Sequence, residues 1–167
     1  MRHTFLGLSS AVLCLLLALP VSAQHVPDFS GQWQRADSND IGSGWGDVIT
    51  VTQQGARLQV EYVLFAPDDR QPPLRFVYDL EGRETRNSFM MGRGVQMQTS
   101  RTKLVGASLE IVTSHELMVE RRAVQSEVRQ VLSLESPATL VVEVTRVGVL
   151  GGPPTTSRSV YRRVAGV

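Results

Sequence analysis

The chain has 167 residues, of which 42% are hydrophobic and 20% charged, and its formal net charge is +1. No long run of like charges occurs, which excludes an electrostatic basis for binding nucleic acid or an anionic membrane surface. This length suits one folded domain, and because Cys14 is the single cysteine, the chain forms no internal disulfide.

The N-terminal segment has the three-part layout of a secretory signal peptide. Residues 1–3 form a short basic region, residues 11–19 are apolar, and small side chains lead up to Ala23. The apolar run is too short to span a bilayer, which needs about 20 residues. We therefore expect cleavage after Ala23, a signal peptide over 1–23, and a mature domain over 24–167 in the periplasm or outside the cell.

Apolar and polar side chains alternate along much of the mature part, with the period of two that half-buried strands show. The clearest examples are residues 29–34, 57–64, 74–81 and 127–134. Turn-forming pairs separate the strands, at Gln54-Gly55, Glu81-Gly82, Gly106-Ala107 and Ser136-Pro137. Residues 115–123 could instead hold a short helix. The pattern predicts a single all-β domain, an antiparallel barrel or sandwich of about eight to ten strands.

Two short segments carry a family resemblance. Residues 28–33 read Asp-Phe-Ser-Gly-Gln-Trp, and residues 161–163 read Tyr-Arg-Arg. The first resembles the opening of lipocalin-like proteins, whose first strand has a Gly-x-Trp signature. The pair is especially similar to a group of exported bacterial lipocalin-like proteins that end in a Tyr-x-Arg strand. The cysteines common in animal lipocalins are absent.

The resemblance implies an antiparallel lipocalin-like β-barrel in which a basic residue of the last strand packs over the first-strand tryptophan. Carried over to this chain, Arg162 or Arg163 would lie on Trp33 and help to close the barrel. A guanidinium over an indole ring contributes about 0.5–2 kcal/mol, depending on how far it is desolvated. We expect this contact to be structural.

The function that these observations favour is the binding of a small apolar ligand in the barrel, without catalysis and without a cofactor. Trp45 belongs to a glycine-rich loop and is either a plug under the barrel end or a ligand contact. The other candidate lining residues lie on apolar strand faces, and they are Tyr62, Leu64, Phe76, Tyr78, Phe89 and Met97. The same side chains would equally fill a solid core.

Two alternatives belong to other classes of function. An enzyme or isomerase would use His115 and Glu116 in a polar barrel interior, but neighbours in a strand point to opposite faces and make a poor proton relay. We therefore assign no catalytic residue. The other alternative is an envelope module with a packed core that docks on a protein partner. An exposed apolar patch would favour it.

Metal binding has only weak support in the sequence. Met90, Met91 and Met97 could offer thioethers to copper(I), although methionine more often fills irregular apolar space. Asp37, Asp40 and Asp47 belong to a glycine-rich stretch, but they lack the regular ligand spacing of a calcium loop. We assign no metal site, and we expect neither nucleic acid nor stable insertion in a membrane after cleavage.

Overall fold

The computed structural model describes residues 26–36, 45–63, 73–91, 94–119, 121–147 and 152–165. All regular structure in these ranges is β-strand. None of the residues described belongs to a helix long and apolar enough to cross a membrane. The strands are β1 (Gly31–Arg35), β2 (Val48–Gln54), β3 (Arg57–Tyr62), β4 (Leu74–Asp79), β5 (Thr85–Met91), β6 (Gly94–Val105), β7 (Ser108–Val119), β8 (Arg122–Ser136), β9 (Thr139–Arg146) and β10 (Thr155–Arg163).

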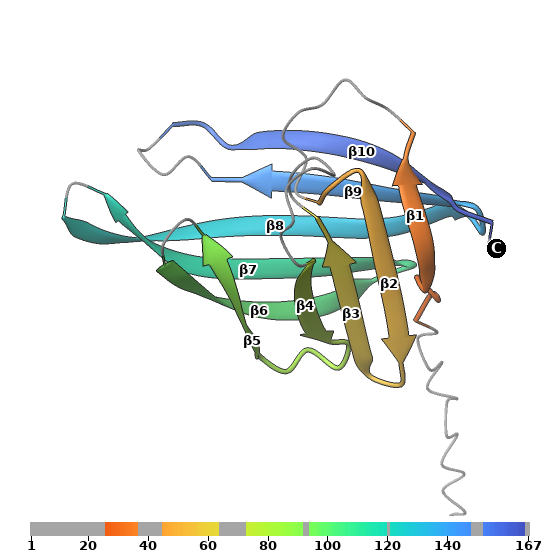
Figure 1. Cartoon of the computed structure of the whole chain (residues 1–167), viewed down its shortest axis with the longest axis horizontal. Coiled ribbons are helices and arrows are strands. Elements are labelled where there is room, and N and C mark those ends of the chain that lie inside the picture. Colours follow the sequence, from red (N-terminus) through yellow and green to blue (C-terminus); the bar gives the residue numbers. More distant parts are fainter. Residues whose placement is uncertain are drawn as a thin grey trace, which may run out of the picture.

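These strands form one antiparallel sheet in the order β4-β3-β2-β1-β10-β9-β8-β7-β6-β5. Every neighbouring pair is adjacent in the chain except β1 and β10, which join its two ends. The sheet curls until its two edge strands, β4 and β5, face each other, so that it is nearly closed into a barrel (Figure 1). The predicted all-β antiparallel fold is therefore confirmed.

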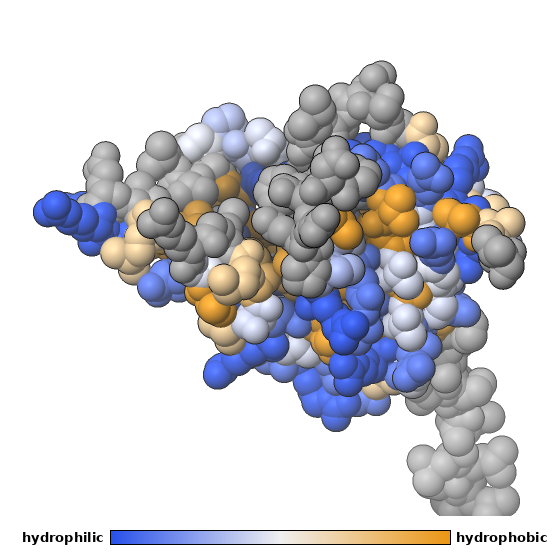
Figure 2. Space-filling view, viewed as in Figure 1, coloured by the Kyte–Doolittle hydropathy of each residue, from blue (hydrophilic) through white to orange (hydrophobic). Residues whose placement is uncertain are grey.

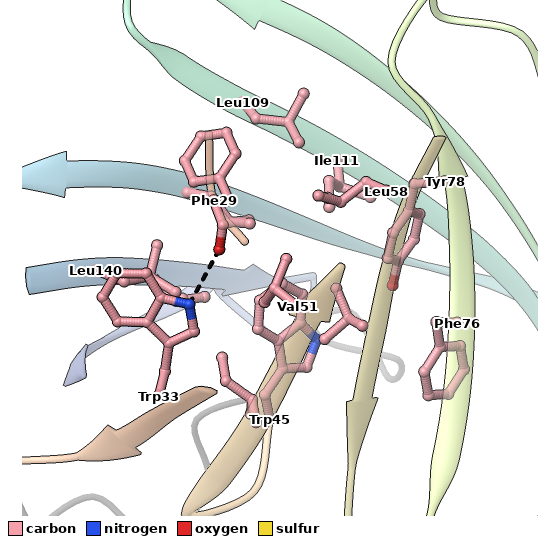
Figure 3. Close-up of a cluster of buried hydrophobic side chains, with 14 of the residues drawn as sticks. Phe29, Trp33, Trp45, Val51, Leu58, Phe76, Tyr78, Leu109, Ile111 and Leu140 are labelled. Carbon is pink, nitrogen blue, oxygen red and sulfur yellow. Dashed lines mark hydrogen bonds between the residues drawn. The ribbon is translucent and has the colours of Figure 1, made fainter. Parts of the chain in front are cut away.

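The core lies between two parts of the sheet that cross. Strands β1–β4 run steeply across the direction of β6–β10 (Figure 1). The inward side chains of β2 and β3 meet those of β7 and β9, as the cluster around Val51, Leu58, Ile111 and Leu140 shows (Figure 3). Burying each large aliphatic side chain contributes about 1.5–3 kcal/mol. Hydrophobic burial is the main stabilising force in this disulfide-free chain.

A side-chain amide connects the two edge strands. The Asn87 Oδ1 accepts the Val77 backbone N–H at 2.8 Å, and the Asn87 Nδ2 donates to the Val77 carbonyl at 3.0 Å. Thr102 adds a bond from its hydroxyl to the Asp79 carbonyl. Asn87 is buried on β5, so its amide takes the place of a neighbouring strand's backbone and satisfies both polar groups of Val77.

The suggestion of a short helix over residues 115–123 was wrong. This stretch is the end of β7 and the start of β8, and the two strands remain paired as far as Val119 and Arg122. Arg121 in the connection has a φ of 64°. Continuous pairing along two long strands supplies hydrogen bonds that a single helical turn could not match, so tertiary context overrides the local preference.

Candidate functional site

The first-strand motif is a connected structural unit. Phe29 is fully buried, its N–H donates to the Gln53 Oε1 at 3.1 Å, and its carbonyl accepts the Trp33 Nε1–H at 3.0 Å (Figure 3). The Ser30 N–H donates to Asp28 at 2.9 Å. Bonds from the Ser30 side chain and backbone hold the pKa of Asp28 below its ordinary value. The motif therefore fixes Trp33 and satisfies its indole N–H in the core.

Arg163 is the arginine that lies over Trp33, with its guanidinium carbon 4.3 Å from the ring centroid. Its Nε donates to the Pro137 carbonyl at 2.8 Å, and its Nη1 donates to the Ser30 carbonyl. Arg162 instead donates to the Thr139 hydroxyl. Arg163 thus ties the first strand, the last strand and the β8–β9 turn together. This role is structural.

Gly31 makes room for that arginine. Its φ of 142° is one that other residues rarely adopt, and a Cβ built there would lie 2.5 Å from the Arg163 Nη1. A side chain at this position would strain the backbone and push the guanidinium off the indole. The glycine of the Gly-x-Trp signature therefore has a steric reason in this chain.

Trp45 is buried at one end of a row of aromatic rings. Its ring centroid lies 6.5 Å from that of Tyr62, Tyr62 stacks on Phe76 at 5.5 Å, and Phe76 meets Phe89 edge-on at 5.7 Å. The Trp45 carbonyl accepts the Tyr161 hydroxyl at 3.0 Å. With only 2% of its surface exposed, Trp45 lies where the plug alternative would put it.

The predicted lining residues fall into three groups. Tyr62, Phe76 and Tyr78 are buried in the core, where burial raises the pKa of both tyrosines and keeps them neutral. Phe89 is half-buried at the edge of the core. Met97 lies on the outer face of β6, with 54% of its surface exposed, and Leu64 is outside the described residues. Of the predicted lining residues, Phe89 is the one that packs against the core and remains half-buried, on the edge strand β5.

Polar side chains that the sequence did not single out line much of the interior of β5–β8. They are buried and share the inward face, and they are Asn87, Ser100, Thr102, Thr113, Ser126 and Gln130. The Ser100 and Thr113 hydroxyls bond each other across β6 and β7 at 2.9 Å. In the sequence, one face of β6 is mainly polar and the other mixes apolar and polar side chains, so alternation did not mark the polar face as the inward one. The interior therefore has an apolar side and a polar side.

His115 is on this polar side, opposite Gln98 of β6 and Ser126 of β8. Glu116 points outward and is exposed, so the two residues do not form a relay. No cluster of three or more metal-ligating side chains occurs among the residues described. Of the three aspartates weighed as calcium ligands, Asp37 and Asp40 are outside the described residues, and the Asp47 Oδ1 lies 3.7 Å from the Arg35 Nε.

We predict a pH effect from His115. Burial lowers its pKa from the ordinary value, so the unfolded state takes up a proton more readily than the folded state. Stability is therefore unaffected above about pH 6.5 and falls as the pH drops below that value. His115→Gln should lose less stability than the parent between about pH 7 and 5, in urea titrations at each pH. An equal loss in both proteins would contradict the assignment.

Arg146 ends β9 on the inward face, two residues beyond the buried Val144. Its charge is near enough to Tyr62 to oppose the rise in the pKa of that phenol, a rise caused first by burial and next by Tyr161. On β10, Ser157 and Ser159 face the same interior, opposite Val144 and Val142. The sequence did not identify these three residues, because they converge only when the sheet curls.

We call this region the polar end, defined by Gln98, His115, Ser126, Arg146 and Ser157 on the inward faces of β6–β10. Three half-buried apolar side chains of the inner face, Leu74, Phe89 and Val128, border the core beside it. Comparisons of the chain with protein families, with curated proteins and with solved structures found no match. The geometry of the polar end is therefore the basis on which a function is assigned.

Proposed function

We propose that this protein is an exported β-barrel that binds a small, largely apolar molecule at the polar end, without catalysis. The observation that carries the proposal is the mixture of side chains there. Leu74, Phe89 and Val128 are half-buried beside these polar side chains, and the fully buried apolar core lies next to them. Ligand sites combine such apolar walls with a few polar groups that orient the ligand.

Two further observations support the proposal. The resemblance of residues 28–33 to the lipocalin-like opening favours carriage of a ligand over chemistry. The geometry of His115 and Glu116, which point to opposite faces of β7, offers no nucleophile and base in contact. The apolar core beneath Phe89 gives the site a rigid floor, which lowers the entropy lost on binding.

The proposal is tested with N-phenyl-1-naphthylamine, a neutral probe whose fluorescence rises in apolar surroundings. We expect protein purified from cells that express the whole chain to bind one molecule of the probe per molecule of protein. Phe89→Ala should weaken binding about tenfold, which corresponds to roughly 1.4 kcal/mol. Val105→Ala, an exposed change beside the Gly106 turn, is the matched control and should bind like the parent.

A probe that fails to bind, together with a native mass that shows no retained compound, would overturn the carrier proposal. The same mass spectrum tests export, because cleavage after Ala23 fixes the mass of the mature chain. An uncleaved chain in the envelope fraction would contradict that part of the proposal.

A second candidate function, an envelope module that docks on a protein partner, is favoured by one exposed apolar patch. Met90 pairs directly with Val95 on the outer face of β5–β6, and Met97 and Met118 share this face. All four side chains are more than half exposed, and apolar side chains over these strand ends are visible in Figure 2. A photocrosslinking residue at Met97, but not at Lys103, should then give a discrete adduct in cells. Equal labelling from both positions would count against the module.

A further inference from the structure

An inward arginine without an acidic partner distinguishes the polar end from an ordinary barrel interior. In the described part of the chain, Arg146 forms no salt bridge, whereas arginines on the outer faces, such as Arg129 and Arg158, pair with glutamates. Arg146 lies opposite Val128 of β8, and the residues before it on the same face of β9 are the core valines Val144 and Val142. A half-buried charge in such surroundings is costly unless an anion balances it.

Two hydroxyls on the inward face of β10, the strand beside Arg146, also have no partner within the described residues. The Oγ atoms of Ser157 and Ser159 are buried and make no hydrogen bond there, and Ser159 is only 1% exposed. Arg146 is paired with Thr155 in the β9–β10 register, which makes Ser157 its diagonal neighbour on the same face. Buried polar groups are nearly always hydrogen-bonded, so unpaired donors on one face point to a missing acceptor.

We propose that the molecule bound at the polar end is an amphiphile with a carboxylate head, and that Arg146 binds that head. This inference rests on the proposed function and names its ligand class. The guanidinium fork matches the two oxygens of a carboxylate, and Ser157 and Ser159 donate to the same oxygens. One arginine neutralises one negative charge, which favours a carboxylate over a doubly charged phosphate.

The apolar part of the ligand lies on the half-buried wall that begins at Leu74 and Phe89. Tyr62 is paired with Leu74 of this wall and stacks on Phe76, and the charge of Arg146 acts on its phenol. Head and chain therefore have separate, adjoining surfaces. A neutral ligand of the same length would use the wall and leave the arginine unpaired.

The test compares dodecanoate with dodecanol by competition against N-phenyl-1-naphthylamine near neutral pH. We expect dodecanoate to bind the parent protein at least about tenfold more tightly, because a charge-assisted bond is formed only with the acid. In Arg146→Met this preference should vanish while dodecanol binds as before. Ser159→Ala should weaken dodecanoate binding about threefold, in line with the loss of one hydrogen bond. Arg158→Met, an outward change on β10, should keep the full preference.

Three outcomes separate the possible failures. Equal binding of acid and alcohol by the parent would overturn the carboxylate inference but leave the barrel as a carrier. Binding of neither compound, nor of the probe itself, would overturn the proposed function as well. Tighter binding of dodecyl phosphate than of dodecanoate would overturn the choice of a carboxylate head. Melting temperatures of all variants show whether each one is folded.

Discussion

Replacing Trp33 with alanine should lower the free energy of unfolding by about 3–5 kcal/mol, as loss of a large buried aromatic side chain does. Trp33 has no exposed surface, its Nε1–H is bonded to Phe29, and Arg163 covers its ring. The change leaves a cavity, an orphaned carbonyl and an arginine without its aromatic surface. Urea unfolding followed by circular dichroism measures the loss.

Trp33→Phe separates the contribution of the buried ring to stability from that of the indole hydrogen bond. It keeps most of the ring and the surface under Arg163 but removes the N–H, so its destabilisation should be clearly smaller. Arg163→Met removes the charge and keeps the length of the side chain, and it should cost about 1–2 kcal/mol. A melting temperature that Trp33→Ala leaves unchanged, with ligand binding lost, would reverse the structural assignment and place Trp33 in the binding site.

The second large effect is expected at Asn87. In Asn87→Leu the N–H and carbonyl of Val77 both lose their partner, and each unsatisfied buried group costs about 1–3 kcal/mol. We expect destabilisation of about 2–4 kcal/mol, measured by urea unfolding. The edges of β4 and β5 would also separate, so the variant should aggregate at lower temperature, as shown by light scattering during heating.

The neighbouring Ser88 provides the control for that experiment. It is exposed on the outer face of the same strand, so Ser88→Ala should change stability by less than about 0.5 kcal/mol. Asn87→Asp keeps the acceptor for the Val77 N–H and loses the donor, and its stability should lie between those of the parent and the leucine variant. If Asn87→Leu were as stable as Ser88→Ala, the amide would not be what holds the edge strands together.

Folding stability and ligand binding should depend on different residues of this barrel. Trp33 and Asn87 act in the apolar core and at the β4–β5 edge, whereas Arg146 lies at the polar end and Ser159 is the next inward residue of β10 after Ser157. Variants of the first kind should therefore lower the melting temperature, and variants of the second kind should change ligand preference. Core and site are built from the same sheet but from different stretches of its strands.

The sequence by itself determined the strands and most of the turns. Alternation such as Leu58, Val60 and Tyr62 is a local pattern, and turns at Gly55 and Gly106 depend only on neighbouring residues, so both can be read without the fold. The resemblance to lipocalin-like proteins predicted that either Arg162 or Arg163 packs on Trp33. The register of β10 then placed Arg163 on the ring and turned Arg162 to Thr139.

Only the tertiary structure decided which side chains meet. Residues 96, 98 and 100 are all polar and share one face, and Met97 lies on the other. Pairing with β5 and β7 turned Ser100 inward and Met97 outward. Asn87 gained its role because the curled sheet brings β4 against β5, which no local pattern records. Arg146 and Ser159 come from separate strands and face one space only because β9 and β10 pair in one register. Convergence of this kind depends on long-range pairing and sheet curvature, and these are properties of the whole barrel.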